Sequence, residues 1–244
     1  MHNYKMTVQY DGTRYSGWQR QGNTSSTIQG RLEQTLSRLL EEPVSVSGSG
    51  RTDGGVHALG QIANFRTNTF LDCNEFRNRL NDALPEDIFV SDLRLAAERF
   101  HARLSAKEKV YRYTIENGTE RNVFGRKYVY HVAESLDMDK MTRAANLLLG
   151  THDFRGYSTG HTKKSTVRHL SAIDIRREGE NLTLTFTGNG FLYNMVRILT
   201  GTLIEVGLSQ RTPESVLTAL ESGKRTDAGF TAPPQGLCLL EVRY

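Results

Sequence analysis

Apolar side chains along this chain follow two different spacings, and the spacing changes from segment to segment. In residues 28–40 they recur every three or four positions, which predicts a helix that Pro43 brings to an end. In residues 6–12 they alternate with polar residues, which predicts a strand that runs into an Asp-Gly turn. Helical and extended segments therefore both occur within the first third of the chain.

The same two spacings predict the remaining elements. Asp72 with Glu75 three residues later resembles a capping box, so a helix is expected to begin there and to end at Pro85. Further strands are predicted over residues 44–48, 60–67, 88–96, 109–117, 127–132, 166–177, 181–188 and 236–244, and further helices over 137–149, 191–206 and 213–221. Strands and helices mix in both halves, which indicates an α+β fold with largely antiparallel sheets and two subdomains, residues 1–104 and 105–244.

The polar segment 13–26, "TRYSGWQRQGNTSS", is long for a connection inside a compact domain, and such loops are usually functional or disordered. It carries Arg14, Trp18 and Arg20. Basic and aromatic side chains in one loop are typical of proteins that bind single-stranded nucleic acid. These three residues are therefore candidate substrate-binding residues.

Net charge points weakly in the same direction. The formal charge is +4 and the pI about 9.1; residues 1–104 carry 12 basic and 12 acidic side chains, so the whole excess lies in residues 105–244. Arginine supplies 23 of the 31 basic residues, and guanidinium groups match phosphate geometry and stack on bases. A mildly basic surface is also compatible with no nucleic-acid partner at all.

Location is indicated by what the sequence lacks. The two cysteines form no C-x-x-C pair, and no apolar run approaches the ~18 residues of a membrane span or follows a basic start as in a signal peptide. We therefore expect a cytoplasmic protein with no membrane association.

The loop "GSGRTDGGVH", residues 48–57, holds the main candidate for catalysis, Asp53, between two candidate substrate-binding residues, Arg51 and His57. It is a near miss of G-x-G-x-x-G, but a strand follows it instead of a helix, so a dinucleotide site is not expected. The seven histidines show no metal-ligand spacing, so no metal site is expected. Asp-Gly is also a common turn, but four glycines exceed what a turn needs, and a lone ionised carboxylate suits nucleophilic attack or proton abstraction.

Six motifs in a fixed order resemble the tRNA pseudouridine synthase A family over residues 4–244. They are "YDGTRYSGWQRQ", "GSGRTDGGVHALGQ", "RFHARLSAKEKVYRY", "GTHDF", "GNGFLYNMVRILTGTLIEVG" and "TAPPQGLCLLEVRY". The resemblance implies isomerisation of uridine to pseudouridine at positions 38, 39 and 40 of the tRNA anticodon stem-loop. It also implies two similar subdomains around a central cleft, a homodimer and no cofactor.

The resemblance also implies roles for single residues. Asp53 matches the catalytic aspartate, Tyr111 the residue that stacks on the target base, and Arg197 the arginine that pairs with the aspartate. Arg197 is expected to share a helical face with Tyr193, four residues earlier. The target base has to be flipped out of the RNA to reach a carboxylate.

The sequence departs from the family pattern at two positions, and its residues alone also allow two other functions. Gly54 follows the aspartate and Tyr157 closes the "HDFRGY" segment, where the family often has other residues. From the residues alone, a non-catalytic RNA-binding module remains an alternative in which Asp53 only forms a turn. A glycosidase or nuclease that uses Asp53 is a further alternative.

Overall fold

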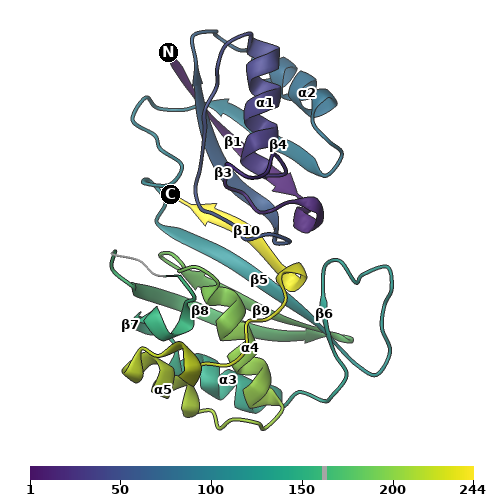
Figure 1. The fold of residues 1–244 in the computed structure, drawn as a ribbon, viewed down its shortest axis with the longest axis vertical. Coiled ribbons are helices and arrows are strands. Elements are labelled where there is room, and N and C mark those ends of the chain that lie inside the picture. The colour runs from purple at the N-terminus through teal and green to yellow at the C-terminus, as the bar shows by residue number, and fades with distance from the viewer. Residues whose placement is uncertain (161–163) are drawn as a thin grey trace. The chain divides into compact units, whose positions relative to one another are not determined.

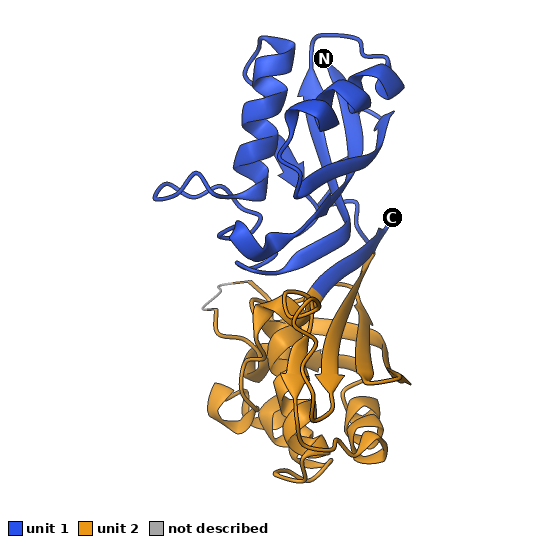
Figure 2. Cartoon of the chain, turned by 90° about the vertical axis from the view of Figure 1, so that its right-hand side faces the viewer, with its two compact units in different colours: residues 1–107, 238–244 blue, residues 108–237 orange. Residues whose placement is uncertain are grey.

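The computed structural model describes residues 1–160 and 164–244; His161, one of the scattered histidines, lies outside them. The chain divides into two compact units, residues 1–107 with 238–244 and residues 108–237 (Figure 2). The last strand is thus grouped with the first unit, whereas the sequence pattern placed it with residues 105–244. Helices combined with mainly antiparallel strand pairs confirm the predicted α+β class.

The first unit is built on a sheet with the strand order β4-β1-β3-β10 (Figure 1). β1 is antiparallel to both β3 and β4, whereas β10 runs parallel to β3, and the short β2 pairs with the far end of β3. Alternate residues of β1 are fully buried because side chains of a strand alternate between two faces. The strands are β1 (His2–Tyr10), β2 (Val46–Gly48), β3 (His57–Thr67), β4 (Ile88–Leu95) and β10 (Leu237–Arg243).

Two helices complete this unit, and both begin at polar caps. In α1 (Ile28–Leu40) the Thr27 hydroxyl accepts the Gly30 N–H, and the helix ends before Pro43 as predicted. In α2 (Cys73–Ala83) the Asp72 carboxylate accepts two backbone N–H groups of the first turn, which confirms the predicted start. α1 packs against α2 and β2, and α2 packs against β4.

The second unit contains a sheet with the order β5-β9-β8-β7, and β6 lies parallel to β5 (Figure 1). The predicted hairpin between β8 and β9 is confirmed, and Gly179 takes a positive φ of 61° in its turn. β7 was not predicted, because four residues are too few to show a period. The strands are β5 (Glu108–Asn117), β6 (Tyr130–Val132), β7 (Gly150–Asp153), β8 (Val167–Glu178) and β9 (Asn181–Gly188).

Helices α3 (Met138–Leu147), α4 (Met195–Gly207) and α5 (Ser215–Ser222) pack on this sheet and on one another. Eleven of the 13 residues of α4 are buried, so this helix forms the centre of the unit's core. The prediction that it begins at residue 191 is wrong, because Asn194 adopts a left-handed conformation and the helix starts after it. Tyr193 therefore precedes the helix, and its predicted shared face with Arg197 is also wrong. None of the helices in the described ranges is long and apolar enough to cross a membrane.

Candidate active site

Asp53 lies in the loop that joins β2 to β3, residues 49–56, and its side chain is partly exposed. The backbone turns sharply after it: the Val56 N–H donates to the Asp53 carbonyl (3.2 Å), and Gly55 has a φ of 79°. The Gly55 N–H also donates to the Tyr15 carbonyl (3.3 Å) in the preceding long loop. A residue with a Cβ would be strained at such a φ, which explains one of the glycines in this motif.

Thr52, the residue before Asp53, is held at two points. Its hydroxyl is 2.8 Å from the Tyr10 hydroxyl at the end of β1. Its carbonyl accepts the Trp18 N–H (3.0 Å) from the long polar segment. Thr52 is buried, so both bonds form away from water and fix the backbone from which Asp53 projects.

Glycines allow the two loops to touch. A Cβ on Gly12 would lie 2.0 Å from the Val56 carbonyl oxygen, so no other residue fits there without a shift of the backbone. Gly17 has a φ of 100°, and a Cβ on it would lie 2.6 Å from the Thr52 carbonyl oxygen. The sequence reading missed Gly17 and Thr52 as parts of the site. The only available signal was the presence of glycines within an otherwise polar loop.

Trp18 is 2% exposed and belongs to the core of the first unit. Its indole lies beneath Gly48, where a Cβ would come within 2.5 Å of the ring, and its centroid is 6.0 Å from that of the Tyr10 ring. Trp18 was a candidate for binding the substrate because basic side chains surround it in the sequence, but its ring has no exposed face on which a base could stack. Trp18 therefore supports the Asp53 loop by packing against Gly48, the residue that precedes it.

His57 begins β3 and is also buried, at 6% exposure. Its Nδ1 accepts the Gly12 N–H at 3.1 Å, and the same nitrogen is 3.2 Å from an oxygen of Asp11. A nitrogen that accepts this N–H has no proton to give to the carboxylate, so we assign its lone pair to the Gly12 bond. His57 was expected to bind substrate, but these contacts make it the anchor of the Asp11-Gly12 turn.

Arg14 is exposed and paired to a carboxylate. Its Nε and Nη2 donate to one oxygen of Asp87 at 2.9 and 2.7 Å, while the Tyr15 hydroxyl donates to the other oxygen at 2.6 Å. The Asp87 carboxylate raises the pKa of Arg14. The guanidinium side chain remains 66% exposed, so it can still meet a phosphate on its open side.

Arg20 and Arg51 lie at the surface of the same region. Arg20 forms an ion pair with Glu33 of α1 (3.1 Å), and 70% of its side chain is exposed. The Arg51 Nε donates to the Gln19 side-chain oxygen at 3.1 Å. Gln19 thereby connects the long polar segment to the Asp53 loop, a contact that the sequence did not indicate.

Tyr111 and Arg197 belong to the second unit. Tyr111 lies in β5, is 7% exposed, and meets the Phe191 ring edge-on, with centroids 5.2 Å apart and planes at 82°. Arg197 lies in the first turn of α4; its Nε donates to the Ala232 carbonyl (2.7 Å) and its Nη1 to the Asn194 side-chain oxygen (2.8 Å). These two bonds fix the plane of the guanidinium.

The extended segment 230–233 holds Arg197 in place, and sequence reasoning did not identify it. The Ala232 N–H donates back to the Arg197 carbonyl (3.1 Å), and the Tyr113 hydroxyl donates to the Pro233 carbonyl (2.7 Å). Burial raises the pKa of Tyr113, so its phenol stays protonated and remains a donor. The segment therefore ties α4 to β5.

Tyr157, one of the two departures from the family pattern, is fully buried in the second unit. Its hydroxyl donates to the Val216 carbonyl of α5 at 2.7 Å, and burial raises the pKa of this phenol. Tyr157 thus packs α5 onto the unit and has no ring face for RNA. The other departure, Gly54, is exposed beside Asp53.

The site residues thus fall into two groups. The loop of Arg51, Asp53 and His57 is braced by the segment that contains Trp18, whereas Tyr111 and Arg197 are placed by elements of the second unit. Among the described residues, no three His, Cys, Asp or Glu side chains gather as metal ligands do.

A carboxylate on a loop whose backbone is fixed on both sides is typical of an enzyme that uses one acidic residue on its substrate. Comparison with known protein families identifies the class of enzyme. The family model described as tRNA pseudouridine synthase matches residues 6–103 and 144–244, which include Asp53 and Arg197. The chain belongs to the tRNA pseudouridine synthase family.

Individual relatives match along their whole length. The chain is 47% identical to tRNA pseudouridine synthase A of Bacillus sp. (strain KSM-64), 45% to that of Geotalea uraniireducens (strain Rf4) and 43% to tRNA pseudouridine synthase A 2 of Clostridium perfringens (strain 13 / Type A). Each match covers 100% of this chain and 100% of the relative.

The burial of Trp18 predicts a structural effect when it is removed. Trp18→Ala should lower the free energy of unfolding by about 3–5 kcal/mol, because it leaves a large cavity beneath the Asp53 loop. Urea denaturation followed by circular dichroism measures this effect, since Trp18 is the only tryptophan and its fluorescence is lost. Trp18→Phe, the control, should lose less. Unchanged stability together with weakened RNA binding would instead indicate that Trp18 is part of the RNA-binding surface.

Proposed function

We propose that the protein isomerises uridine to pseudouridine in tRNA, at positions 38, 39 and 40 of the anticodon stem-loop. Membership of the tRNA pseudouridine synthase family supports the reaction and the substrate class. The three positions rest on the resemblance of the motifs to the A branch of that family. We assign Asp53 as the catalytic nucleophile.

The reaction conserves every atom of the nucleotide. The bond between N1 of uracil and C1′ of ribose breaks, the base turns, and C5 bonds to C1′; C5 loses its hydrogen and N1 gains one. Enzymes that cleave glycosidic bonds with retention use one carboxylate as nucleophile and a second group as acid. Uracil is a better leaving group than an alcohol, so one carboxylate suffices for the departure of the base.

The observation that carries this proposal is the clamp around Asp53. The Thr52 carbonyl and the Gly55 N–H are bonded to the neighbouring long segment, and the Thr52 hydroxyl is bonded to Tyr10 at the end of β1, while the Asp53 side chain stays partly exposed. A turn aspartate needs no such support. A nucleophile does, because small displacements of the attacking atom greatly lower the rate.

The second unit supplies the other two functional residues in this proposal. Tyr111 supports the flipped uracil with its ring, and the edge contact from Phe191 keeps that ring in one orientation. Arg197 presents a guanidinium whose plane is fixed, which suits pairing with the catalytic carboxylate. Arg14, Arg20 and Arg51 are exposed cations that bind tRNA phosphates.

The active form in this proposal is a cytoplasmic homodimer. Cys73 and Cys238 are both reduced, which is compatible with a reducing compartment. Two-fold pairs are the commonest assemblies of identical chains, and the family resemblance favours one here.

Asp53→Asn separates a catalyst from a turn. The amide keeps the size and turn propensity of aspartate but is a poor nucleophile, so turnover should fall at least roughly 10³-fold, about 4 kcal/mol of barrier. Tritium release from 5-tritiated uridine in tRNA, measured in a single turnover, reports the loss of the C5 hydrogen. tRNA binding and the melting temperature should change little.

Asp174→Asn is the matched control for Asp53→Asn, because Asp174 is an exposed strand residue outside the site. Near-normal release by Asp53→Asn would falsify the catalytic assignment and favour a non-catalytic RNA-binding module. Asparagine deamidates next to glycine, so any residual activity is compared with that of Asp53→Ala. Free uracil or cleaved RNA among the products would indicate a glycosidase or nuclease.

Tyr111→Ala and Tyr111→Phe test the stacking role. Loss of the ring should weaken tRNA binding by roughly 1–3 kcal/mol, whereas Tyr111→Phe keeps the ring and should bind nearly as the unmodified protein. If the Tyr111 hydroxyl also relays a proton, Tyr111→Phe should bind tRNA normally but turn over slowly. Because Tyr111 is buried, each variant is first checked by thermal melting. Normal turnover in both variants would remove Tyr111 from the site.

Arg20→Ala tests whether the long segment meets the RNA backbone. One lost phosphate contact should weaken binding and reduce the slope of log affinity against log salt by about one unit. Binding is titrated at several salt concentrations, with Arg14→Ala in parallel. Arg38→Ala, an exposed arginine in the last turn of α1, is the control and should leave the slope unchanged. An unchanged slope for both Arg14→Ala and Arg20→Ala would place these arginines away from phosphate.

A further inference from the structure

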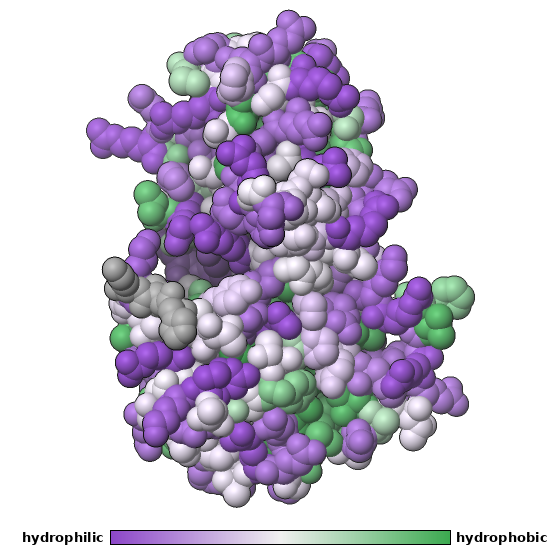
Figure 3. Space-filling view, in the orientation of Figure 1, coloured by the Kyte–Doolittle hydropathy of each residue, from purple (hydrophilic) through white to green (hydrophobic). Residues whose placement is uncertain are grey.

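The guanidinium of Arg197 is held by one backbone group and one side chain. Polar and charged side chains cover most of the face shown in Figure 3, so an arginine near the surface is by itself no sign of function. The Arg197 Nε donates to the Ala232 carbonyl (2.7 Å), and its Nη1 donates to the Asn194 side-chain oxygen (2.8 Å). Of these two partners, the Asn194 side chain is the one that a substitution can remove.

Asn194 directly precedes α4 and has a left-handed backbone, with φ 60° and ψ 4°. Its carbonyl accepts the Ile198 N–H (3.0 Å), so Asn194 is the N-cap residue of the helix. Few residues adopt a left-handed conformation readily, and glycine does so at the lowest cost. Glycine would therefore fit this position well, and the presence of a side chain has to be explained by what the side chain contacts.

The Asn194 side chain does not stabilise its own helix in the usual way. An asparagine at an N-cap ordinarily accepts a backbone N–H of the first turn. Within the residues that the structure describes, the Asn194 side chain makes no such bond. Its oxygen accepts from Arg197 instead, and its Nδ2 donates to the Thr159 hydroxyl at 2.8 Å. The carboxamide thus connects the arginine to Thr159.

The bond to Thr159 decides which end of this carboxamide faces the arginine. A guanidinium has only donors, so it can bond to the oxygen of an amide but not to the nitrogen. Because Nδ2 donates to Thr159, the oxygen is directed toward Arg197. The neighbouring Ser158 hydroxyl donates to the Tyr193 carbonyl at 3.1 Å, which keeps Thr159 beside Asn194.

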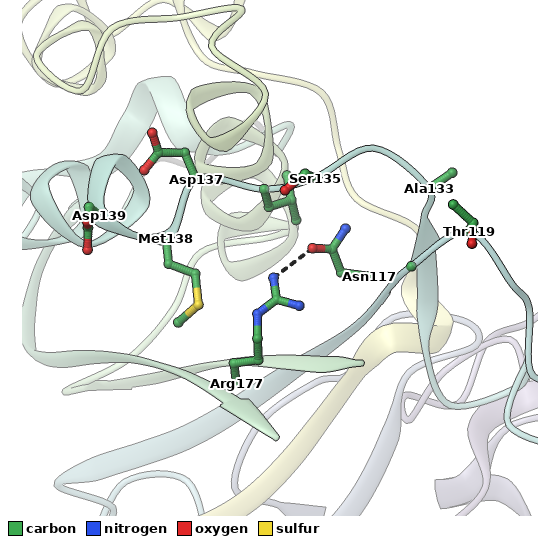
Figure 4. Close-up of a pocket in the computed structure, with 10 residues that line it drawn as sticks. Asn117, Thr119, Ala133, Ser135, Asp137, Met138, Asp139 and Arg177 are labelled. Atoms are coloured by element: carbon green, nitrogen blue, oxygen red, sulfur yellow. Dashed lines mark hydrogen bonds between the residues drawn. The ribbon is translucent and has the colours of Figure 1, made fainter. Parts of the chain in front are cut away.

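A second arginine–asparagine pair in the same unit has a different setting. The Arg177 guanidinium donates to the Asn117 side-chain oxygen at 2.7 Å, beside a pocket of the second unit (Figure 4). The Asn117 Nδ2 donates to the carbonyls of Val132 and Glu134, so this asparagine ties β5 to the end of β6 and the residues after it. Its contacts serve the fold, and the pair provides a matched control for Asn194 and Arg197.

We propose that Asn194 is a positioning residue for the isomerase reaction, which acts by holding the Arg197 guanidinium in one orientation. An arginine side chain has many rotamers, and pairing with a catalytic carboxylate requires one placement. The inference rests on the proposed pairing of Arg197 with Asp53 and adds the side chain that orients the arginine. The competing explanation is that asparagine is only tolerated in a left-handed turn.

Asn194→Gly separates these two explanations, because glycine keeps the left-handed backbone and removes only the carboxamide. The single-turnover rate of tritium release should fall about 10- to 100-fold, since a displaced catalytic group is far less effective. The Kd for tRNA should change by less than about twofold, because phosphate contacts dominate affinity. Ser209→Gly is the matched control: Ser209 also has a positive φ, 58°, and its hydroxyl accepts from Lys140. It should leave the rate unchanged.

Asn194→Asp is the conservative variant, because it tolerates the same φ and keeps an oxygen for Nη1. Its rate should lie within about threefold of that of the unmodified protein. Thr159→Val removes the acceptor that orients the amide and should lower the rate about three- to tenfold. Added to Asn194→Asp, Thr159→Val should have no further effect, because both ends of a carboxylate are acceptors.

Arg197→Lys tests whether Asn194 acts through the arginine. Lysine keeps the positive charge but lacks the planar group that Asn194 holds. If Asn194 acts through Arg197, adding Asn194→Gly to Arg197→Lys should lower the rate no further. A role elsewhere in the fold would lower the rate by the same factor in both backgrounds. In the control background, Arg177→Lys, the full effect of Asn194→Gly should remain.

Nitrogen NMR of arginine side chains measures the orientation without the reaction. Arginine is labelled with ¹⁵N, and the signals of Arg197 are identified by their absence in Arg197→Lys. The two Nη groups of Arg197 should give separate signals, because its hydrogen bonds oppose rotation of the guanidinium. Loss of one bond in Asn194→Gly should accelerate this rotation at least about tenfold. The signals of Arg177 should not change.

Slow turnover and faster rotation of the Arg197 guanidinium in Asn194→Gly, with recovery in Asn194→Asp, support the inference. An unchanged rate or unchanged Arg197 signals in Asn194→Gly would overturn it, and so would equal slowing in the Arg197→Lys background. A normal rate for Arg197→Lys would contradict the proposed role of Arg197 and overturn the inference with it. Slow Arg197→Lys with normal Asn194→Gly would overturn the inference alone and leave the proposed function standing.

Discussion

The contact between the segment of residues 11–18 and the loop of Asp53 is the interaction on which the first unit's site depends. Two pieces of irregular backbone meet at van der Waals distance, and their N–H and carbonyl groups bond to each other. Buried backbone groups without partners would be costly, so the two loops fold correctly only together. Gly12 and Gly17 permit this approach because neither has a Cβ, and Trp18 fills the space beneath.

This constraint explains how an exposed carboxylate is held precisely enough for chemistry. Loops are usually the mobile parts of a protein, and catalytic groups on them need support from rigid elements. Here Tyr10 of β1 bonds to Thr52 of the loop, and His57 at the start of β3 bonds to Gly12 of the neighbouring segment, so both pieces of backbone are connected to the sheet. The exposed position of Asp53 and its rigid backbone are thus compatible.

The second unit applies the same principle with different elements. A segment without regular structure, residues 230–233, runs along α4 and reaches β5, and through its carbonyl groups it orients Arg197 and bonds Tyr113. In this unit a strand carries Tyr111 and a helix carries Arg197, so these candidate side chains need less support from neighbouring loops than Asp53 does.

Local sequence signals were enough to locate much of the secondary structure and the main candidate for catalysis, Asp53. Periodicity and caps located α1, α2 and the β8–β9 hairpin, because these signals are local: a side chain and the backbone within four residues of it decide them. The motifs also identified Asp53, Tyr111 and Arg197, whose roles remain predictions. Local signals failed at Asn194, where a left-handed residue delays the helix, and at β7, which is too short to show a period.

Which of the candidate substrate-binding residues face solvent depends on the tertiary structure. Trp18 and His57 have the chemistry of binding residues, yet both are buried: Trp18 packs beneath Gly48 and His57 bonds to Gly12. Arg14, Arg20 and Arg51 remain exposed. The partners that make this difference, Gly48 for Trp18 and Gly12 for His57, lie 30 and 45 residues away. Burial is a property of such distant contacts, and a residue type with its immediate neighbours does not contain that information.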